Sequence, residues 1–210
     1  MKAFETMVAS DGYEVMLFPL EYMEISQDEG GSYSHSGTLS MDFLGWGRNG
    51  RILLCPYYAP CTCRLVYKST SGAYNIFNSV NKVHTPSGLQ YVCFMVAHDD
   101  NLPFNLNDIV RQGELLGHTG TAGNVTGDHV HFNMASGTYQ GQQQMPPDNN
   151  WQLINSIHVY NGLYVNDTVI VNGMGHNWLE YSGGIKPLHK NLKFKWVLYA
   201  NKIRSKAQNN

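Results

Sequence analysis

Histidine residues that stand close together in an alternating run are the first candidates for chemistry in this sequence. The segment from Gly120 to Phe132 is rich in glycine and ends in a run where His129 and His131 stand two residues apart. On a β-strand, residues i and i+2 point to the same face. Both imidazoles therefore project together, while Val130 and Phe132 project into a core. Two imidazoles on one strand face are a starting point for a metal site or a metal–base pair.

Further candidate ligands stand upstream of this run. His35 and Asp42 lie within one short span, and His98 ends the apolar run 95–97. His35, Asp42 and His131 would together offer two nitrogens and one oxygen to Zn²⁺. A fourth position would remain for water, which is the arrangement of a catalytic rather than a structural zinc site. His98 and His129 would then be free for proton transfer and charge stabilisation.

The order of these residues resembles that of the peptidoglycan metalloendopeptidases of the lysostaphin and LytM type. The resemblance spans residues 33–134. It rests on motifs in the family's order, which are Tyr58-Ala59-Pro60, Ala97-His98, the run 110–117, Thr119-Gly120 and the run 126–132. The family usually spaces its first histidine and aspartate as His-x-x-x-Asp, whereas six residues separate His35 from Asp42 here. A longer preceding loop would have to return Asp42 to the metal.

The resemblance implies a zinc-dependent endopeptidase that hydrolyses peptide cross-links or stem peptides of bacterial peptidoglycan. In this interpretation His35, Asp42 and His131 hold the metal. Either His98 or His129 takes the proton of the attacking water, and the other stabilises the oxyanion. The alternative is a catalytically inactive metallopeptidase-like module that binds the wall or activates another wall enzyme. The presence of all five residues favours the enzyme.

The apolar residues occur in short runs separated by Gly, Pro and Asn. This pattern predicts an all-β fold, with an antiparallel β-sheet peptidase core and a cleft lined by loops. We expect strands at residues 15–18, 52–55, 62–67, 73–77, 91–96, 129–134 and 194–199. Only residues 150–156 hint at a helical turn. Residues 136–150 read as a loop that could wall the cleft, with Tyr139 and Trp151 more simply interpreted as packing residues.

The chain is long enough for one sizeable domain with an appendage. We expect a zinc metallopeptidase domain at residues 1–160, with the motif core at 33–134. A small β-rich C-terminal extension with a basic tail would follow at residues 161–210. The four cysteines lie among strand-like apolar residues, where free thiols behave as small hydrophobes, so we expect no disulfide framework.

Charge is distributed unevenly along the chain, although the net charge is only −2. Residues 1–185 hold all sixteen acidic residues and seven basic ones, whereas residues 186–210 hold seven basic residues. A basic tail can bind an anionic polymer. We expect contact with anionic wall polymers rather than nucleic acid, and the alternative is a solvated chain end.

The N-terminal sequence bears on where the protein acts. Residues 1–18 include Glu5, Asp11 and Glu14 and lack a continuous apolar core, which predicts no signal peptide. No run approaches the roughly 20 apolar residues of a transmembrane segment. Together with the resemblance, these features lead us to expect a bacteriophage endolysin-like protein. It would be made in the host cytoplasm and then released to the cell wall, or carried in the virion.

Overall fold

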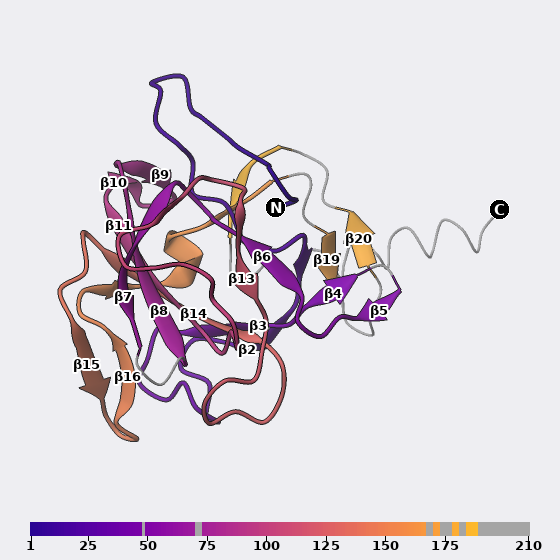
Figure 1. Ribbon diagram of the computed structural model, residues 1–210, viewed down its shortest axis with the longest axis vertical. Helices are drawn as coiled ribbons and strands as arrows, with labels where there is room; N and C mark the ends of the chain where they lie inside the picture. Colours follow the sequence, from indigo (N-terminus) through magenta and orange to yellow (C-terminus); the bar gives the residue numbers. More distant parts are fainter. Residues whose placement is uncertain (48, 70–72, 167–169, 173–177, 181–183, 189–210) are drawn as a thin grey trace, which may run out of the picture.

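The regular secondary structure of the described residues consists almost entirely of short β-strands (Figure 1). The computed structural model describes residues 1–210 except 48, 70–72, 167–169, 173–177, 181–183 and 189–210. Within that part, the 3₁₀ turn η1 (Val159–Asn161) is the only helical element. The predicted all-β, antiparallel fold is confirmed. A search of the described residues for a helix able to cross a membrane finds none.

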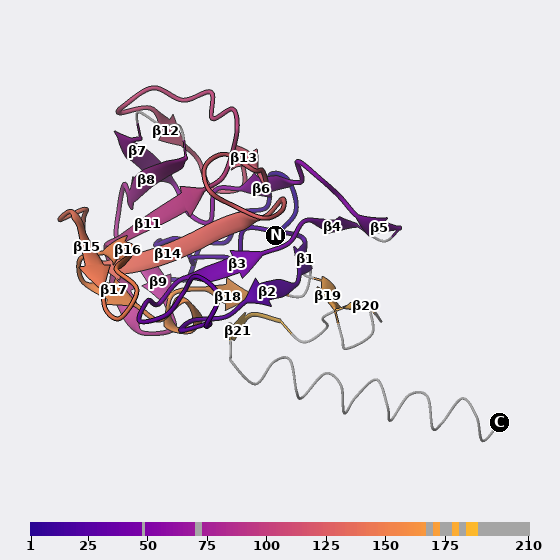
Figure 2. The same ribbon diagram turned by 90° about the horizontal axis from the view of Figure 1, so that it is seen from below.

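One large antiparallel sheet forms the framework. Its strands run in the order β12-β7-β8-β11-β14-β3-β2, and β17 also pairs with β14. Figure 2 shows most of this succession, from β7 at the top through β11 and β14 to β2 below. The bounds are β2 Ile25–Gln27, β3 Met41–Phe43, β7 Cys63–Lys68, β8 Tyr74–Ser79, β11 Val92–Ala97, β12 Ile109–Val110, β14 Val130–Ser136 and β17 Ser156–Ile157.

Smaller pairings surround this sheet. The two-stranded ones are β4–β5, β6–β13, β9–β10, β15–β16 and β18–β21, and β1-β19-β20 form a three-stranded sheet. The bounds are β1 Tyr22–Met23, β4 Trp46–Gly47, β5 Gly50–Arg51, β6 Pro56–Tyr58, β9 Val83–Thr85, β10 Gly88–Gln90, β13 Leu115–His118, β15 Gln142–Met145, β16 Asn150–Leu153, β18 Tyr164–Val165, β19 Ile170–Asn172, β20 Trp178–Glu180 and β21 Lys186–Pro187.

Alternation along the central strands separates a packed face from a face that carries polar groups. On β14, Val130 and Phe132 enter the main hydrophobic core, whereas His131 faces the other side. Neighbouring strands add aromatic rings to the core, and Phe94 stacks on both Phe77 and Phe132 with centroids 5.4 Å and 5.7 Å away. This aromatic layer backs the strands that carry the predicted ligands.

Two local predictions from the sequence are wrong. Residues 52–55 form a turn with exposed Leu53 and Leu54, and the next strand begins only at Pro56. Residues 150–156 are not helical, because β16 pairs with β15 as a hairpin, and β15 itself lies within the predicted loop 136–150. The Gln-Gln-Gln-Met sequence of β15 shows no alternation, so pairing and burial at the base of the hairpin outweigh local propensity.

The remaining predictions about the ends of the chain have mixed outcomes. At residues 15–18 only isolated bridges form, from Val15 to His84 and from Leu17 to Tyr164. The strand predicted at 194–199 and six of the seven basic residues of the tail lie outside the described residues. All four cysteines are buried free thiols, as expected.

The described part of the C-terminal extension packs against the start of the chain. The Tyr164 backbone accepts a hydrogen bond from the Phe18 amide and donates one to the Met16 carbonyl, both at 2.8 Å. β1 pairs with β19, and Leu163 and Val165 enter the main core. The extension therefore shares its core with residues 1–160, and the domain division at residues 160 and 161 stays a prediction.

We expect Phe132→Ala to destabilise the protein by about 3–5 kcal/mol, because the ring is fully buried between two neighbouring strands and its removal leaves a cavity. Urea unfolding measures this change. Phe4→Ala is the matched control, since that ring is 81% exposed and its loss should change stability by less than about 0.5 kcal/mol. Equal unfolding midpoints for the two variants would contradict the described core.

Candidate metal centre and cleft

Three side-chain atoms form a nearly equilateral triangle on the polar face of the sheet. His35 Nε2 lies 3.2 Å from Asp42 Oδ1, Asp42 Oδ1 lies 3.0 Å from His131 Nδ1, and the two nitrogens are 3.1 Å apart. Ligand atoms bound tetrahedrally at zinc distances lie about 3.4 Å from one another. The donors therefore fit Zn²⁺ with a small outward adjustment. No second group of this kind occurs in the described part of the chain.

Strand register explains why two of these side chains meet. β14 pairs with β3 so that His131 stands directly opposite Asp42, and on its other side His131 stands opposite Ala97 of β11. Directly opposite side chains on antiparallel strands have Cβ atoms about 4.5–5.5 Å apart. The alternation that buries Phe132 thus turns His131 toward Asp42.

His35 reaches the triangle from the loop at residues 28–40, which joins β2 to β3. Its Nδ1 lies 3.1 Å from the Asp28 carbonyl oxygen. Because a carbonyl only accepts hydrogen bonds, Nδ1 carries the proton and Nε2 presents its lone pair to the triangle. A hydrogen bond of this kind is the usual support that orients a metal-binding imidazole.

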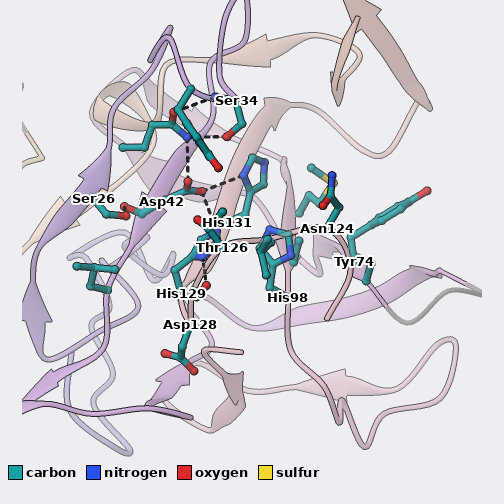
Figure 3. A pocket seen from close by; sticks show the side chains of 18 of the residues that line it. Ser26, Ser34, Asp42, Tyr74, His98, Asn124, Thr126, Asp128, His129 and His131 are labelled. Atoms are coloured by element: carbon teal, nitrogen blue, oxygen red, sulfur yellow. Dashed lines mark hydrogen bonds and ion pairs between the residues drawn. The ribbon is translucent and has the colours of Figure 1, made fainter. Parts of the chain in front are cut away.

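His98 and His129 lie beside the triangle, with their ring centroids 4.6 Å apart (Figure 3). Each ring donates its Nδ1 proton to a backbone carbonyl at 2.8 Å, that of Ala122 for His98 and that of Gly127 for His129. Each therefore keeps Nε2 for other contacts, and His129 Nε2 lies 3.5 Å from Asp42 Oδ1. His98 also has a left-handed backbone (φ 77°), which is uncommon for a residue other than glycine.

The protonation states suit metal binding. Burial opposes ionisation of Asp42, but the close contacts of its carboxyl with the imidazoles of His131 and His35 outweigh burial and hold the pKa of this carboxyl well below its usual range. Burial lowers the pKa of His98 to about 4, and burial likewise lowers the pKa of His131. At neutral pH Asp42 is therefore a carboxylate and the imidazoles of His98 and His131 are neutral, which are the forms that bind metal or accept a proton.

A buried carboxylate stands next to His98 and another next to His129, and each fixes the loop that carries its histidine. Asp128, just before His129, accepts hydrogen bonds from the Thr119 hydroxyl at 2.7 Å and the Leu54 amide at 2.9 Å. Asp99, just after His98, accepts one from the His118 amide at 2.7 Å. Both carboxylates bind segments that lie far from their own loops in sequence, so each histidine is held by the surrounding fold.

Gly120 lies where these two loops cross. It exchanges backbone hydrogen bonds with His129, at 3.1 Å and 3.2 Å. A Cβ atom at this position would clash with the carbonyl oxygen of His98. Only glycine allows this close approach of the backbones, so the glycine-rich segment serves to bring His98 and His129 together.

The triangle opens into a cleft of about 1260 Å³. Loops and the β15–β16 hairpin wall it, as the sequence predicted for a cleft lined by loops. Trp151, Tyr33 and Leu53 present apolar surface there, with exposed fractions of 55%, 76% and 67%. The packing interpretation is right for Tyr139, whose ring lies 5.9 Å from that of Tyr67, and wrong for Trp151, which lines the cleft.

All five residues singled out in the sequence lie together at this site, and their roles stay predictions. The sequence reasoning missed Asp99 and Asp128, although an acidic residue beside each histidine is a visible signal. It also missed Gln27, whose side chain donates a hydrogen bond to Asp42 Oδ2 at 3.0 Å. No local pattern marks this glutamine, because its contact depends on the pairing of β2 with β3.

A comparison with known sequences finds a phage relative. The chain is 37% identical over 171 residues to Morphogenesis protein 1 of Bacillus phage B103. The match covers 80% of this chain and 45% of that protein, so the chain spans less than half the length of this relative. No family model matches the sequence.

Solved structures similar to the chain include lysostaphin from Staphylococcus simulans, at 16% identity and a TM-score of 0.40, covering 62% of this chain and 48% of that one. A zinc-containing peptidase from Vibrio cholerae has 17% identity and a TM-score of 0.43, covering 62% and 43%. The catalytic domain of a prophage-encoded M23 protein from Enterococcus faecalis has 17% identity and a TM-score of 0.40, covering 63% and 88%. These are peptidases of the type that the motifs resemble.

We expect Thr119→Val to lower the free energy of unfolding by about 1–3 kcal/mol, because the Thr119 hydroxyl is buried and serves both Asp128 and the Cys55 amide. Urea unfolding at pH 7 measures the loss. Thr138→Val, at an exposed position, is the matched control and should be near neutral. If both variants unfold like the parent protein, Asp128 does not depend on this hydroxyl.

Proposed function

We propose that this protein is a zinc-dependent endopeptidase that hydrolyses peptide cross-links or stem peptides of bacterial peptidoglycan. The observation that carries the proposal is the triangle of His35 Nε2, Asp42 Oδ1 and His131 Nδ1, with two further imidazoles at its edge and a cleft in front of it. Two nitrogens and one oxygen leave an open fourth position, which distinguishes catalytic from structural zinc sites.

The residues have separable roles. A zinc ion held by the triangle would act as a Lewis acid on the scissile carbonyl and would lower the pKa of its water to about 7. His98 or His129, whose Nδ1 protons are engaged by backbone carbonyls, accepts the proton of the nucleophile at Nε2. The other imidazole would stabilise the developing oxyanion in its imidazolium form, in which Nε2 also carries a proton and can donate a hydrogen bond.

The size and the lining of the cleft suit a polymeric substrate better than a small molecule. Its volume of about 1260 Å³ is open along walls from several loops, and Trp151, Tyr33 and Leu53 offer exposed apolar surface beside the polar centre. The peptidoglycan assignment follows the motif resemblance of residues 33–134. Attachment to anionic wall polymers through the basic tail is a further part of the proposal.

The name of the Bacillus phage relative supports a phage setting for this activity. A peptidase that belongs to phage morphogenesis would act on the wall as part of, or alongside, the particle. We therefore favour a virion-associated protein over one released from the host cytoplasm. A particle preparation probed for the protein by mass spectrometry separates these two locations.

We expect one Zn²⁺ per chain in the purified protein and a strong loss of zinc in His131→Ala, because the substitution removes one of three ligands. Elemental analysis after dialysis against a weak chelator measures the stoichiometry. His84→Ala is the matched control, since its ring pairs with Asp11 at 2.8 Å, outside the residues that line the cleft. Full zinc retention in His131→Ala would remove this residue from the ligand set.

We expect His98→Ala and His129→Ala to retain zinc and to lose about 10²- to 10⁴-fold in hydrolysis of purified peptidoglycan, which is the usual contribution of proton transfer by a positioned side chain. Mass spectrometry of the released fragments measures the rate and identifies the bond. Rates within a few-fold of the parent protein in both variants would exclude the proposed mechanism. A parent protein that binds zinc and walls without hydrolysis would instead be the inactive module.

A further inference from the structure

Strand pairing does not position His35, because this residue lies on the loop at residues 28–40. His131 and Asp42 meet through strand register, but His35 stands seven residues before Asp42, on a loop. A flexible loop of this length costs conformational entropy to close. Something beyond the strands must therefore hold His35 Nε2 at 3.2 Å from Asp42 Oδ1.

The side chain of Gln27 connects the two ligands. Its Nε2 donates to Asp42 Oδ2 at 3.0 Å and to the Ser34 hydroxyl at 2.7 Å. Its Oε1 accepts a hydrogen bond from the Ser34 amide at 3.0 Å. The amide thus uses both of its protons and its oxygen. Only one orientation of the amide satisfies all three contacts, because the backbone N–H of Ser34 requires an acceptor.

The three hydrogen bonds of Gln27 engage Asp42, a member of the triangle, and Ser34, the neighbour of His35. The bond to Asp42 Oδ2 occupies the oxygen that is not part of the triangle and leaves Oδ1 to face the metal position. The bonds to Ser34 fix the residue that directly precedes His35. The next residue after Gln27 completes the arrangement, since the Asp28 carbonyl accepts the Nδ1 proton of His35 at 3.1 Å.

We propose that Gln27 is a positioning residue that presets Asp42 as a one-oxygen ligand and holds the His35 loop against it before metal binds. This inference rests on the proposed function, because it assigns the triangle to zinc. Side chains that hydrogen-bond to metal ligands without binding the metal themselves typically contribute about 10- to 100-fold to metal affinity or activity. Gln27 would also explain how the chain tolerates a longer His–Asp spacing than the family usually has.

The test is zinc affinity, measured by competition with a chromophoric chelator. Gln27→Met keeps the length of the side chain and removes all three hydrogen bonds. We expect its zinc dissociation constant to rise by about 10- to 100-fold. Gln140→Met is the matched control, since Gln140 is exposed and does not line the cleft, and it should bind zinc like the parent protein. Parent-like affinity in Gln27→Met would overturn the proposal.

A spectroscopic readout separates positioning of Asp42 from simple support of the loop. Gln27→Glu keeps an oxygen for the Ser34 amide and, in its ionised form, has no proton for Asp42 Oδ2. Because the Asp42 carboxylate raises the pKa of the introduced carboxyl, the spectra are recorded from pH 7 to pH 9. In the cobalt-substituted protein, a released carboxylate that binds through both oxygens raises the coordination number and weakens the visible absorption bands. We expect weaker bands in Gln27→Glu. If Gln27→Met fails to fold, Gln27→Glu still tests whether Gln27 positions Asp42. An unchanged cobalt spectrum in Gln27→Glu would overturn the proposal.

The outcome for the parent protein distinguishes this inference from the proposed function. If the parent chain binds neither zinc nor cobalt, the zinc assignment itself fails. If the parent binds zinc and hydrolyses peptidoglycan while both Gln27 variants match it in affinity and spectrum, only the role of Gln27 fails.

Discussion

The pairing of β14 with β3 is the constraint on which the site depends. It sets His131 opposite Asp42, and the same pairing sends Val130 and Phe132 into the core on the other face. A slip of one residue in an antiparallel pair turns every side chain to the opposite face. Such a slip would bury the imidazole and expose the aromatic ring, so the hydrophobic core enforces the geometry of the ligands.

The sheet alone does not complete the site, and buried or half-buried polar side chains connect the remaining parts to it. Asp99 and Asp128 each bind a backbone amide from a distant segment, and Gln27 binds a loop residue and a ligand together. Buried polar groups are costly unless they are hydrogen-bonded. Each of these side chains has partners for its polar atoms, so it can hold a loop in a fixed position near the triangle without weakening the core.

Much of this arrangement could be predicted from sequence, because the central strands obey simple alternation. The run from His129 to Phe132 indicates both the strand and its two faces, and the order of motifs marks the same five residues that lie together in the structure. The hairpin of β15 and β16 could not be predicted, since its sequence lacks alternation and its pairing depends on contacts at its base. The contact of Gln27 depends on which strand pairs with β3, and no local pattern contains that information.

The β15–β16 hairpin contacts the rest of the molecule both at its base and near its tip. Gln152 accepts a hydrogen bond from the Leu39 amide at 3.1 Å, and Asn133 accepts one from the Leu153 amide at 2.9 Å. Its far end at residues 146–149 is exposed, and Trp151 lies between base and tip on the wall of the cleft. Near the tip, Asn150 donates a hydrogen bond to the Ser36 carbonyl at 3.3 Å, and the Pro146 backbone packs against Gly37, so the hairpin also supports the loop that carries His35. A substitution of Trp151, which is 55% exposed, would therefore change the wall of the cleft, whereas a substitution near the tip would also reach the loop beside the triangle.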